Sequence, residues 1–546
     1  MHSISVPIPA PRLSPSGRSR PALVFLILAV GNPIHAPAAE DATPDFFGVV
    51  RRFADAMIDR SRTNLSEPKS PLFPIVLTRD TYEIPKGNVQ NLVTARVPQE
   101  FKNIANPHHD QNLYQILYAL SKLTGDARYA AEADTVLRHF LRNCQDTRYG
   151  FYAWGEHLGW DFAKNAPGGF PAQNSGSASI HEFYRPWIFW GKSFELAPDS
   201  ALRFARALWK HQINHQGTIS WSRHAYLLKD EPSRRGFEFP RHGGFYIATW
   251  AEAFRRTGDP EMLQAIDAVV GYFESHRDPK TGVIPHYSGL EYDRSGKELL
   301  TVYSPSNVSL AVDLHDAARS MPEASKQRML DLARSIDRSI MALPHDPGPG
   351  GKGFVLFARA DATEPVDLWR NPKDPMNGLP PVRIAYSGGW RTAYRGQQPH
   401  VRIMPALIAR HRQNDSPDYR RLILACADNY VTAAPDFAPE IETAKTAGRS
   451  PDVEAGTIGN VMVVLNAAFK ISGDSKYLNR AEWFGAWAVQ NFWPDASPLP
   501  RASVREDVYS APSRSDTLVM ALLHTWLLRN QPERERDVSL IPTDRS

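Results

Sequence analysis

Residues 112–141 read NLYQILYALSKLTGDARYAAEADTVLRHFL, and this stretch predicts the fold. Its apolar residues recur at intervals of three and four on both sides of Thr124-Gly125-Asp126, as they do in two amphipathic helices joined by a tight turn. Gly125 is suited to end the first helix and Asp126 to cap the second. With its continuation to Cys144, the stretch predicts a helical hairpin.

The same plan recurs along the chain. Two more stretches carry Gly-Asp at the turn, 246–276 and 460–492. Three others keep the length and the periodicity without Gly-Asp: 185–213, 309–341 and 401–433. Single helices predicted at 45–60 and 515–528 can pair as a seventh hairpin. Amphipathic hairpins bury their apolar faces against neighbours, and a closed ring leaves no bare terminal repeat. We therefore predict an all-α fold, an (α/α) toroid of seven hairpins, with a ring of six and an open solenoid as alternatives.

The first 39 residues have the features of a secretory signal peptide. A positively charged flank precedes an apolar run at 22–30, and small residues follow at 36–39. The run is too short to span a bilayer, and no later run approaches the required length. We therefore expect a signal peptide at 1–39, a single catalytic toroid domain at 40–546, a periplasmic or secreted location, and no membrane association after cleavage.

Composition narrows the function classes. Of the 546 residues, 42% are hydrophobic and 22% are charged, which suits a large globular core rather than a disordered chain. There is no basic tract interleaved with aromatic residues, so we expect no nucleic-acid partner, and nothing indicates an oligomeric state. The two cysteines, Cys144 and Cys426, could form one disulfide or remain two buried thiols.

Two connections between the hairpins are long, 61–109 and 343–400, and they contain strand-like pieces at 74–78 and 354–357. Connections of this length in a compact domain are usually functional or disordered. We expect either the walls of a substrate cleft, carrying small sheets, or ordinary surface excursions.

Four side chains form the main candidate site: His157, Glu182, Arg223 and His224. Two imidazoles and one carboxylate suit Mn, Co, Ni or Zn better than they suit calcium, which prefers an all-oxygen cage. A guanidinium beside one of these ligands can hold an anionic substrate. The alternatives are structural. Each histidine could simply be part of the fold, with its hydrogen bonds made inside the protein, and Glu182 could stabilise the start of its helix.

The order of these four residues resembles polysaccharide lyase family 2, the pectate and exopolygalacturonate lyases. The words that carry the resemblance lie within 152–225: WGEH at 154–157, HEFYRPW at 181–187, LWKHQ at 208–212 and SRH at 222–224. The resemblance implies a divergent member with an α/α-toroid fold, a transition-metal site and an acidic polysaccharide or oligosaccharide as substrate. It implies that His157, Glu182 and His224 bind the metal and that Arg223 is catalytic. The long inserted loops could change which uronate polymer fits.

The chemistry of a uronate polymer agrees with that site. Elimination removes the proton at C5 and expels the group on C4, and the proton is acidic enough only when the adjoining carboxylate is neutralised. A divalent cation can do this as a Lewis acid, and an arginine can add two parallel hydrogen bonds. The family assigns the base to Arg223, although a guanidinium ordinarily stays charged, so a Tyr or Lys elsewhere in the site is the alternative.

A second Arg-His pair, Arg241-His242, also precedes an aromatic helix and could be the metal or substrate site. We predict that it binds substrate, together with Arg185 and Trp154. His181 is a possible substitute ligand. The triplet 108–110, His-His-Asp, also has metal-binding side chains, but adjacent side chains diverge, and its aspartate is placed to cap the following helix.

Three other function classes compete with the lyase. A glycoside hydrolase of the six-hairpin type, acting on uronides, would use two carboxylates, with Asp161, Glu252 and Asp313 as candidates. A sugar epimerase would use histidine pairs, although a secretion signal argues against that largely cytoplasmic chemistry. A non-catalytic glycan-binding protein would use only the aromatic side chains.

Overall fold

The computed structural model describes residues 44–62, 70–89, 102–146, 148–156, 158–169, 179–180, 186–223, 225–226, 238–286, 291–373, 381, 383–388, 400–432, 453–538 and 540–544. All of them belong to one compact unit, Ala42–Ser546. The remaining unit, Met1–Asp41, contains the predicted signal peptide and lies outside the described residues.

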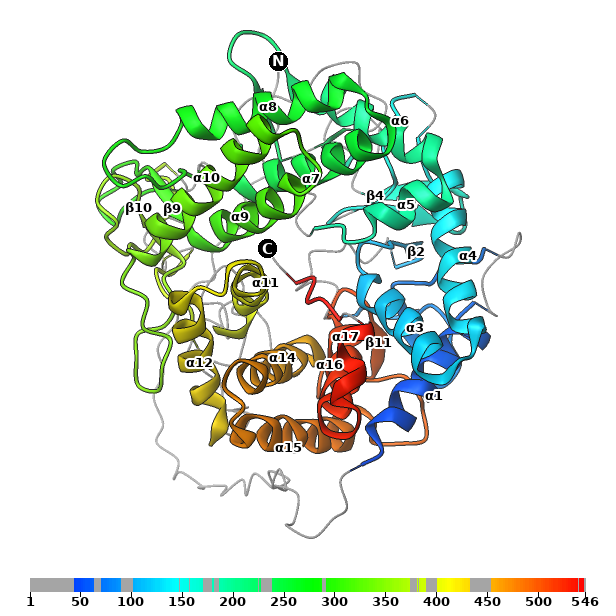
Figure 1. Ribbon diagram of the computed structural model, residues 1–546. Helices are drawn as coiled ribbons and strands as arrows, with labels where there is room; N and C mark the ends of the chain where they lie inside the picture. The colour runs from blue at the N-terminus through cyan, green and yellow to red at the C-terminus, as the bar shows by residue number, and fades with distance from the viewer. Residues whose placement is uncertain are drawn as a thin grey trace, which may run out of the picture. The chain divides into compact units, whose positions relative to one another are not determined.

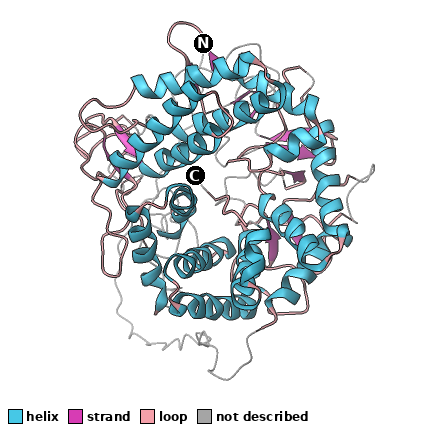
Figure 2. Ribbon diagram, viewed as in Figure 1, coloured by secondary structure: helices cyan, strands magenta, loops and turns pink. Residues whose placement is uncertain are grey.

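Helical hairpins make up most of this unit (Figures 1 and 2). Six of them are consecutive in the sequence: α3 (Gln111–Thr124) with α4 (Ala127–Asn143), α5 (Trp190–Leu196) with α6 (Pro198–Ala207), α7 (Pro240–Thr257) with α8 (Pro260–Ser275), α9 (Ser304–Ala318) with α10 (Glu323–Met341), α11 (Met404–Asn414) with α12 (Pro417–Val431), and α14 (Ala455–Ser472) with α15 (Ser475–Phe492). The predicted seventh pair forms between α1 (Phe46–Asp59) and α16 (Ser515–Asn530), where the rings of Phe47 and Trp526 stack at 4.4 Å. The predicted (α/α) toroid is therefore confirmed.

The Gly-Asp turns behave as their chemistry predicts. In three hairpins a glycine ends the first helix in the left-handed conformation, and the next residue, an aspartate, accepts a hydrogen bond from a backbone N–H of the second helix. The glycines are Gly125, Gly258 and Gly473, with φ of 78°, 68° and 72°, and the aspartates are Asp126, Asp259 and Asp474. The hairpin predicted at 185–213 lacks this turn. Its first helix begins only at Trp190, and its second ends in a π-helical turn, η2 (Leu208–Gln212).

In the six consecutive hairpins the first helix lies on the inner side of the ring, in the seventh pair α16 does, and the inner helices run parallel (Figure 1). Neighbouring inner helices are hydrogen-bonded at matched positions. The bonds join Asn112 to Thr517 at 2.9 Å (starts of α3 and α16), Asn466 to Thr525 at 3.0 Å (middles of α14 and α16), and the backbone N–H of Arg241 to Ser306 at 2.9 Å (starts of α7 and α9). We call the end of the ring where these helices begin the N-terminal mouth.

The strands are short and connect the hairpins (Figure 2). All pairs are antiparallel: β1 (Val76–Thr78) with β11 (Val508–Ser510), β2 (Ile104–Ala105) with β3 (Leu158–Asp161), β3 with β4 (Ala166–Gly169), β5 (Ser179–Ile180) with β8 (Ala225–Tyr226), β6 (Ile213–Asn214) with β7 (Ser220–Trp221), and β9 (Thr301–Tyr303) with β10 (Phe357–Arg359). The strand-like piece at 74–78 is confirmed as β1. The one at 354–357 is shifted, because β10 begins at Phe357 and Val355 makes only an isolated bridge to Tyr386.

The C-terminal part of the unit fills the middle of the ring. After η4 (Pro532–Arg534) and α17 (Glu535–Val538), residues 540–544 run between the inner helices toward the N-terminal mouth (Figure 1, red). We call these residues the central segment. Ile541 and the side-chain amide of Gln115 exchange two hydrogen bonds of 2.7 and 2.9 Å, and Asp544 forms a 3.2 Å ion pair with Arg514. The central segment therefore lies inside the ring, bonded to α3 and to the residue that precedes α16.

The structure decides between the two alternatives for the cysteines and corrects the expectation about segments long enough to cross a membrane. Cys144 and Cys426 are both buried free thiols, so the disulfide alternative is wrong. Contrary to the expectation that no later run is long enough, α14 is sufficiently long and apolar to cross a membrane by length and composition, with a mean hydropathy of 1.2. Because 78% of that window is buried inside the unit, α14 has the surroundings of a core helix.

Candidate active site

The predicted metal ligands His157, Glu182 and His224 lie outside the described residues, as do Arg185 and His181. Among the residues that are described, no cluster of three or more His, Cys, Asp and Glu side chains is placed to hold a metal ion. The metal site therefore stays a prediction, and the structure bears on it through the residues that flank it.

Buried Asn106 holds the backbone on both sides of position 157. Its amide nitrogen donates to the carbonyl of Gly155 at 2.7 Å and to that of Leu158 at 2.9 Å. Leu158 begins β3, where it pairs with Gly169 of β4. An amide that bonds two carbonyls of a non-helical segment satisfies groups that secondary structure leaves unpaired, and it fixes the course of the chain there. No motif in the sequence singles out this asparagine.

The segments that lead to Glu182 and away from His224 are paired with each other. In β5 and β8, Ser179 is the partner of Tyr226 and Ile180 is the partner of Ala225. Strand β5 ends two residues before Glu182, and β8 begins one residue after His224. Segments that adjoin Glu182 and His224, about forty residues apart in the sequence, are thus paired with each other.

Arg223 is half-buried and follows a well-anchored hairpin. The amide of Gln212, on η2, donates to the carbonyl of Ser222 at 2.6 Å. In β7, Trp221 is fully buried and its indole lies 4.8 Å from the ring of Tyr272 on α8. The backbone just before Arg223 is therefore tied to two helical hairpins of the ring.

The second Arg-His pair opens α7 at the N-terminal mouth. Arg241 is half-buried, and its guanidinium carbon lies 5.0 Å from the ring centre of Phe239. His242 is fully buried and stacks on the same ring at 5.4 Å. Of the pair, only Arg241 keeps exposed surface, so it is the one placed to meet a substrate directly.

Trp154 is fully buried and has rings on several sides. The nearest belong to Trp187 at 4.8 Å, Tyr152 at 4.9 Å and His108 at 5.5 Å. An indole with no exposed surface has no face open to a sugar ring, so its surroundings favour a packing role behind the site.

The region that holds these residues matches a known family. Residues 89–275 match the family model of periplasmic pectate lyases. They are related to polysaccharide lyase family 2. The match spans every predicted ligand, Arg223 and Arg241, and it extends the resemblance stated above for 152–225. It supports a carbohydrate-active enzyme, from a family described as periplasmic.

Solved structures with similar folds are distant in sequence. A D-mannose isomerase is 10% identical, with 90% of this chain and 99% of that chain covered and a TM-score of 0.44. A cellobiose 2-epimerase from Bacillus thermoamylovorans is 11% identical, with 88% and 98% covered and a TM-score of 0.43. An unsaturated glucuronyl hydrolase specific for heparin is 11% identical, with 88% and 97% covered and a TM-score of 0.42.

Two of the carboxylates considered for a hydrolase, Asp161 and Glu252, make structural contacts. Asp161 accepts two backbone N–H bonds from the turn that follows it. Burial raises the pKa of Glu252, but hydrogen bonds from Arg255 and Arg256 outweigh this and hold it below its usual value. Asp313 is buried on α9. Asp161 and Glu252 thus have structural partners.

Two buried tyrosines near the start of α3 were not singled out in the sequence. Burial raises the pKa of Tyr114 and Tyr509 well above the usual value, and the nearby carboxylates of Asp110 and Asp516 raise it further. Burial and these carboxylates therefore favour the protonated form of both phenols. Asp110 occupies the N-cap position of α3 as predicted, but its side chain makes no capping hydrogen bond.

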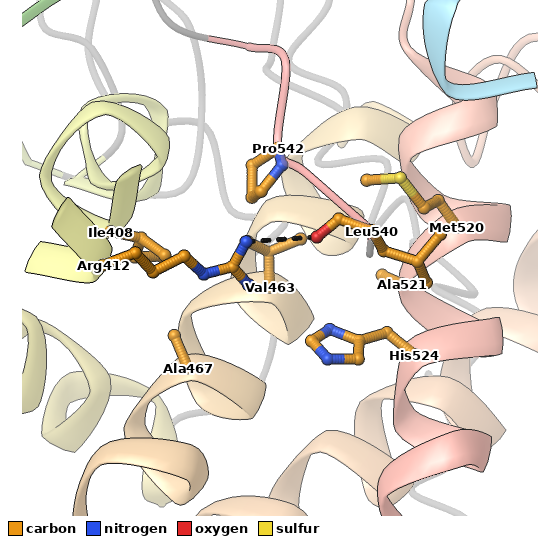
Figure 3. A pocket seen from close by; sticks show the side chains of 9 residues that line it. All are labelled: Ile408, Arg412, Val463, Ala467, Met520, Ala521, His524, Leu540 and Pro542. Atoms are coloured by element: carbon orange, nitrogen blue, oxygen red, sulfur yellow. Dashed lines mark hydrogen bonds between the residues drawn. The ribbon is translucent and has the colours of Figure 1, made fainter. Parts of the chain in front are cut away.

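A separate pocket lies beside the central segment, away from the N-terminal mouth (Figure 3). Its lining is mostly apolar and comes from the helices α11, α14 and α16 and from the central segment. The lining residues are Ile408, Arg412, Val463, Ala467, Met520, Ala521, His524, Leu540 and Pro542. Arg412 donates to the carbonyl of Leu540 at 3.2 Å. The pocket lies outside the segment that matches the lyase family, and its described contacts anchor the central segment.

Proposed function

We propose that this chain is a polysaccharide lyase that cleaves a uronic-acid-containing polymer, of the pectate or polygalacturonate kind, by metal-assisted β-elimination. One observation carries the proposal. Within the segment that matches periplasmic pectate lyases, β5 pairs with β8, and these strands directly flank the segments that contain Glu182 and His224.

The donor set fits a divalent transition metal. His157, Glu182 and His224 offer two imidazoles and one carboxylate, which suit Mn, Co, Ni or Zn. Such an ion, when bound, supplies Lewis-acid neutralisation of the substrate carboxylate. Asn106 and the paired strands β5 and β8 support this assignment because they hold described backbone that adjoins these positions.

Arg223 is the proposed base. It takes the proton from C5, the electron pair of that C–H bond forms the double bond between C4 and C5, and the oxygen on C4 leaves with its electrons. The bond from Gln212 to Ser222 supports a fixed position for Arg223. Burial and neighbouring carboxylates raise the pKa of Tyr114 and Tyr509, which makes these two phenols weaker candidates for the base.

The electrostatics of the N-terminal mouth suit an acidic substrate. The inner helices begin there, so the positive ends of their dipoles are directed toward one opening. Arg241, at the start of α7, can bind the carboxylate of a neighbouring uronate residue in a bidentate manner. We propose a periplasmic or secreted location, in keeping with the family description and the predicted signal peptide.

The test is the ultraviolet absorbance of the product. Elimination leaves a conjugated unsaturated uronide that absorbs, whereas hydrolysis and simple binding leave none. Purified mature enzyme with Mn, Co or Ni should raise the absorbance on polygalacturonate or a related uronan, and Arg223→Ala should abolish the rise. Arg206→Ala is the matched control, because Arg206 is exposed and pairs with Asp259 away from the mouth. Chain cleavage without the chromophore would instead support the two-carboxylate hydrolase.

A further inference from the structure

We infer that Phe239 is a positioning residue that holds the guanidinium of Arg241 at the N-terminal mouth. The inference rests on the proposed function in one respect, that Arg241 binds a carboxylate of the substrate. Phe239 itself is buried, with 1% of its surface exposed, so it acts through Arg241 and not on the polymer.

Phe239 contacts both the side chain and the backbone at the start of α7. The guanidinium carbon of Arg241 lies 5.0 Å from the ring centre, within the range of a cation–π interaction. The carbonyl of Phe239 accepts the backbone N–H of His242 at 3.0 Å. The backbone N–H of Arg241 donates to Ser306 at 2.9 Å, so the first turn of α7 is also fixed to α9. Arg241 therefore has an anchored backbone and a guanidinium that rests on a buried ring.

The ring of Phe239 is itself supported by a ladder of aromatic groups. His286 stacks on it at 3.9 Å with an interplanar angle of 13°, and Tyr303 lies 5.4 Å from His286. Tyr303 in turn stacks on Phe357 at 4.8 Å, and these two residues are also partners in the β9–β10 pair. Phe357 belongs to the long insertion 343–400, so that insertion supports the ring on which Arg241 rests.

A supported ring matters because a free arginine side chain has many rotamers. Resting the guanidinium on an aromatic face restricts those rotamers before substrate binds, so less conformational entropy is lost on binding. Removing the ring should weaken substrate binding and leave the chemical step unchanged, because Arg241 contacts a neighbouring sugar unit and not the reacting atoms. Losing a cation–π interaction of the usual strength should raise KM by about 2- to 30-fold.

The experiment replaces the ring while keeping apolar bulk. Phe239→Leu removes the aromatic face, Phe239→Met does so with a more adaptable side chain should the first variant fold poorly, and Phe239→Tyr restores the face. Phe354→Leu is the matched control, because Phe354 is also fully buried and stacks on His345 at 4.0 Å and 13°, with no cation over its ring among the described residues. For each full-length holoenzyme, KM and kcat on polygalacturonate are measured, together with the rate at which phenylglyoxal modifies Arg241, read by peptide mass spectrometry.

Phe239→Leu should raise KM within the stated range, leave kcat near the wild-type value and speed the modification of Arg241. Phe239→Tyr should restore the wild-type KM and the wild-type modification rate of Arg241. Phe354→Leu should lower the thermal midpoint of unfolding but change neither KM nor that modification rate. The inference is overturned if Phe239→Leu and Phe239→Met change neither KM nor the reactivity of Arg241, or if Phe354→Leu raises KM as much. If the wild type forms no unsaturated product, the proposed function fails. The modification rate then decides by itself whether Phe239 positions Arg241.

Discussion

Replacing Asp544 by alanine tests whether the central segment holds the ring together. Asp544 and Arg514 form an ion pair of 3.2 Å in which the two side chains are only 1% and 8% exposed. Thr517 also donates to Asp544 at 3.0 Å. Asp544→Ala therefore leaves a buried guanidinium without its carboxylate and a hydroxyl without its acceptor. Breaking a buried pair by removing one partner costs about 3–5 kcal/mol of the free energy of unfolding, and we expect a loss in this range.

The assay is denaturant unfolding of the full chain, followed by circular dichroism and by tryptophan fluorescence. Asp331→Ala is the control, because Asp331 forms an exposed ion pair with Arg334 and its loss should leave the midpoint unchanged. The double variant Asp544→Leu with Arg514→Met should recover most of the lost stability, since no unpaired charge remains. If Asp544→Ala unfolds at the same midpoint as Asp331→Ala, the central segment is not docked as the contacts indicate.

Three further predictions concern chemistry and pH. Dialysis against a chelator should abolish the ultraviolet product while circular dichroism stays unchanged, and His224→Ala should have the same effect, with only weak rescue by added metal. Arg223→Ala should lower kcat more than it raises KM, and Arg241→Ala should do the reverse in steady-state kinetics; the opposite pattern would exchange their roles. Burial lowers the pKa of His345 to about 4. The unfolded chain therefore binds the proton more readily than the folded chain does. The free energy of unfolding should fall by about 3 kcal/mol as the pH drops from about 6.5 to 4. In unfolding experiments, His345→Gln should remove this dependence on pH.

The hairpins could be predicted because their signals are local. Gly125 and Asp126 act through their own backbone and the next few residues, so the turn is visible without knowledge of its neighbours. The hairpin predicted at 185–213 was placed less well for the same reason. It has no glycine at its turn, and the cap of its first helix, Phe189, makes no side-chain hydrogen bond, so periodicity alone could not locate the helix start.

Contacts between distant parts of the sequence could not be predicted in this way. The pairing of Gln115 with Ile541 joins residues more than four hundred positions apart, and neither residue type suggests the other. The stacking of Phe239 on His286 likewise depends on how α7 meets the chain after α8. Trp154 shows another limit. The sequence cannot tell an exposed indole from one that is enclosed by other rings, as the indole of Trp154 is.

The described backbone next to the candidate site is irregular, and buried amide side chains bond to it. Short strands and loops leave carbonyl and N–H groups that no helix ladder satisfies, and burying such groups without partners is costly. Gln111, at the start of α3, donates to the carbonyl of Pro186 at 2.9 Å and accepts from the N–H of Ile188 at 3.0 Å, just after the segment that contains Glu182. Asn106 and Gln212 bond the backbone beside His157 and Arg223 in the same manner. Each amide lies beside or on a helix of the ring, so the helices hold the described backbone that adjoins the candidate residues.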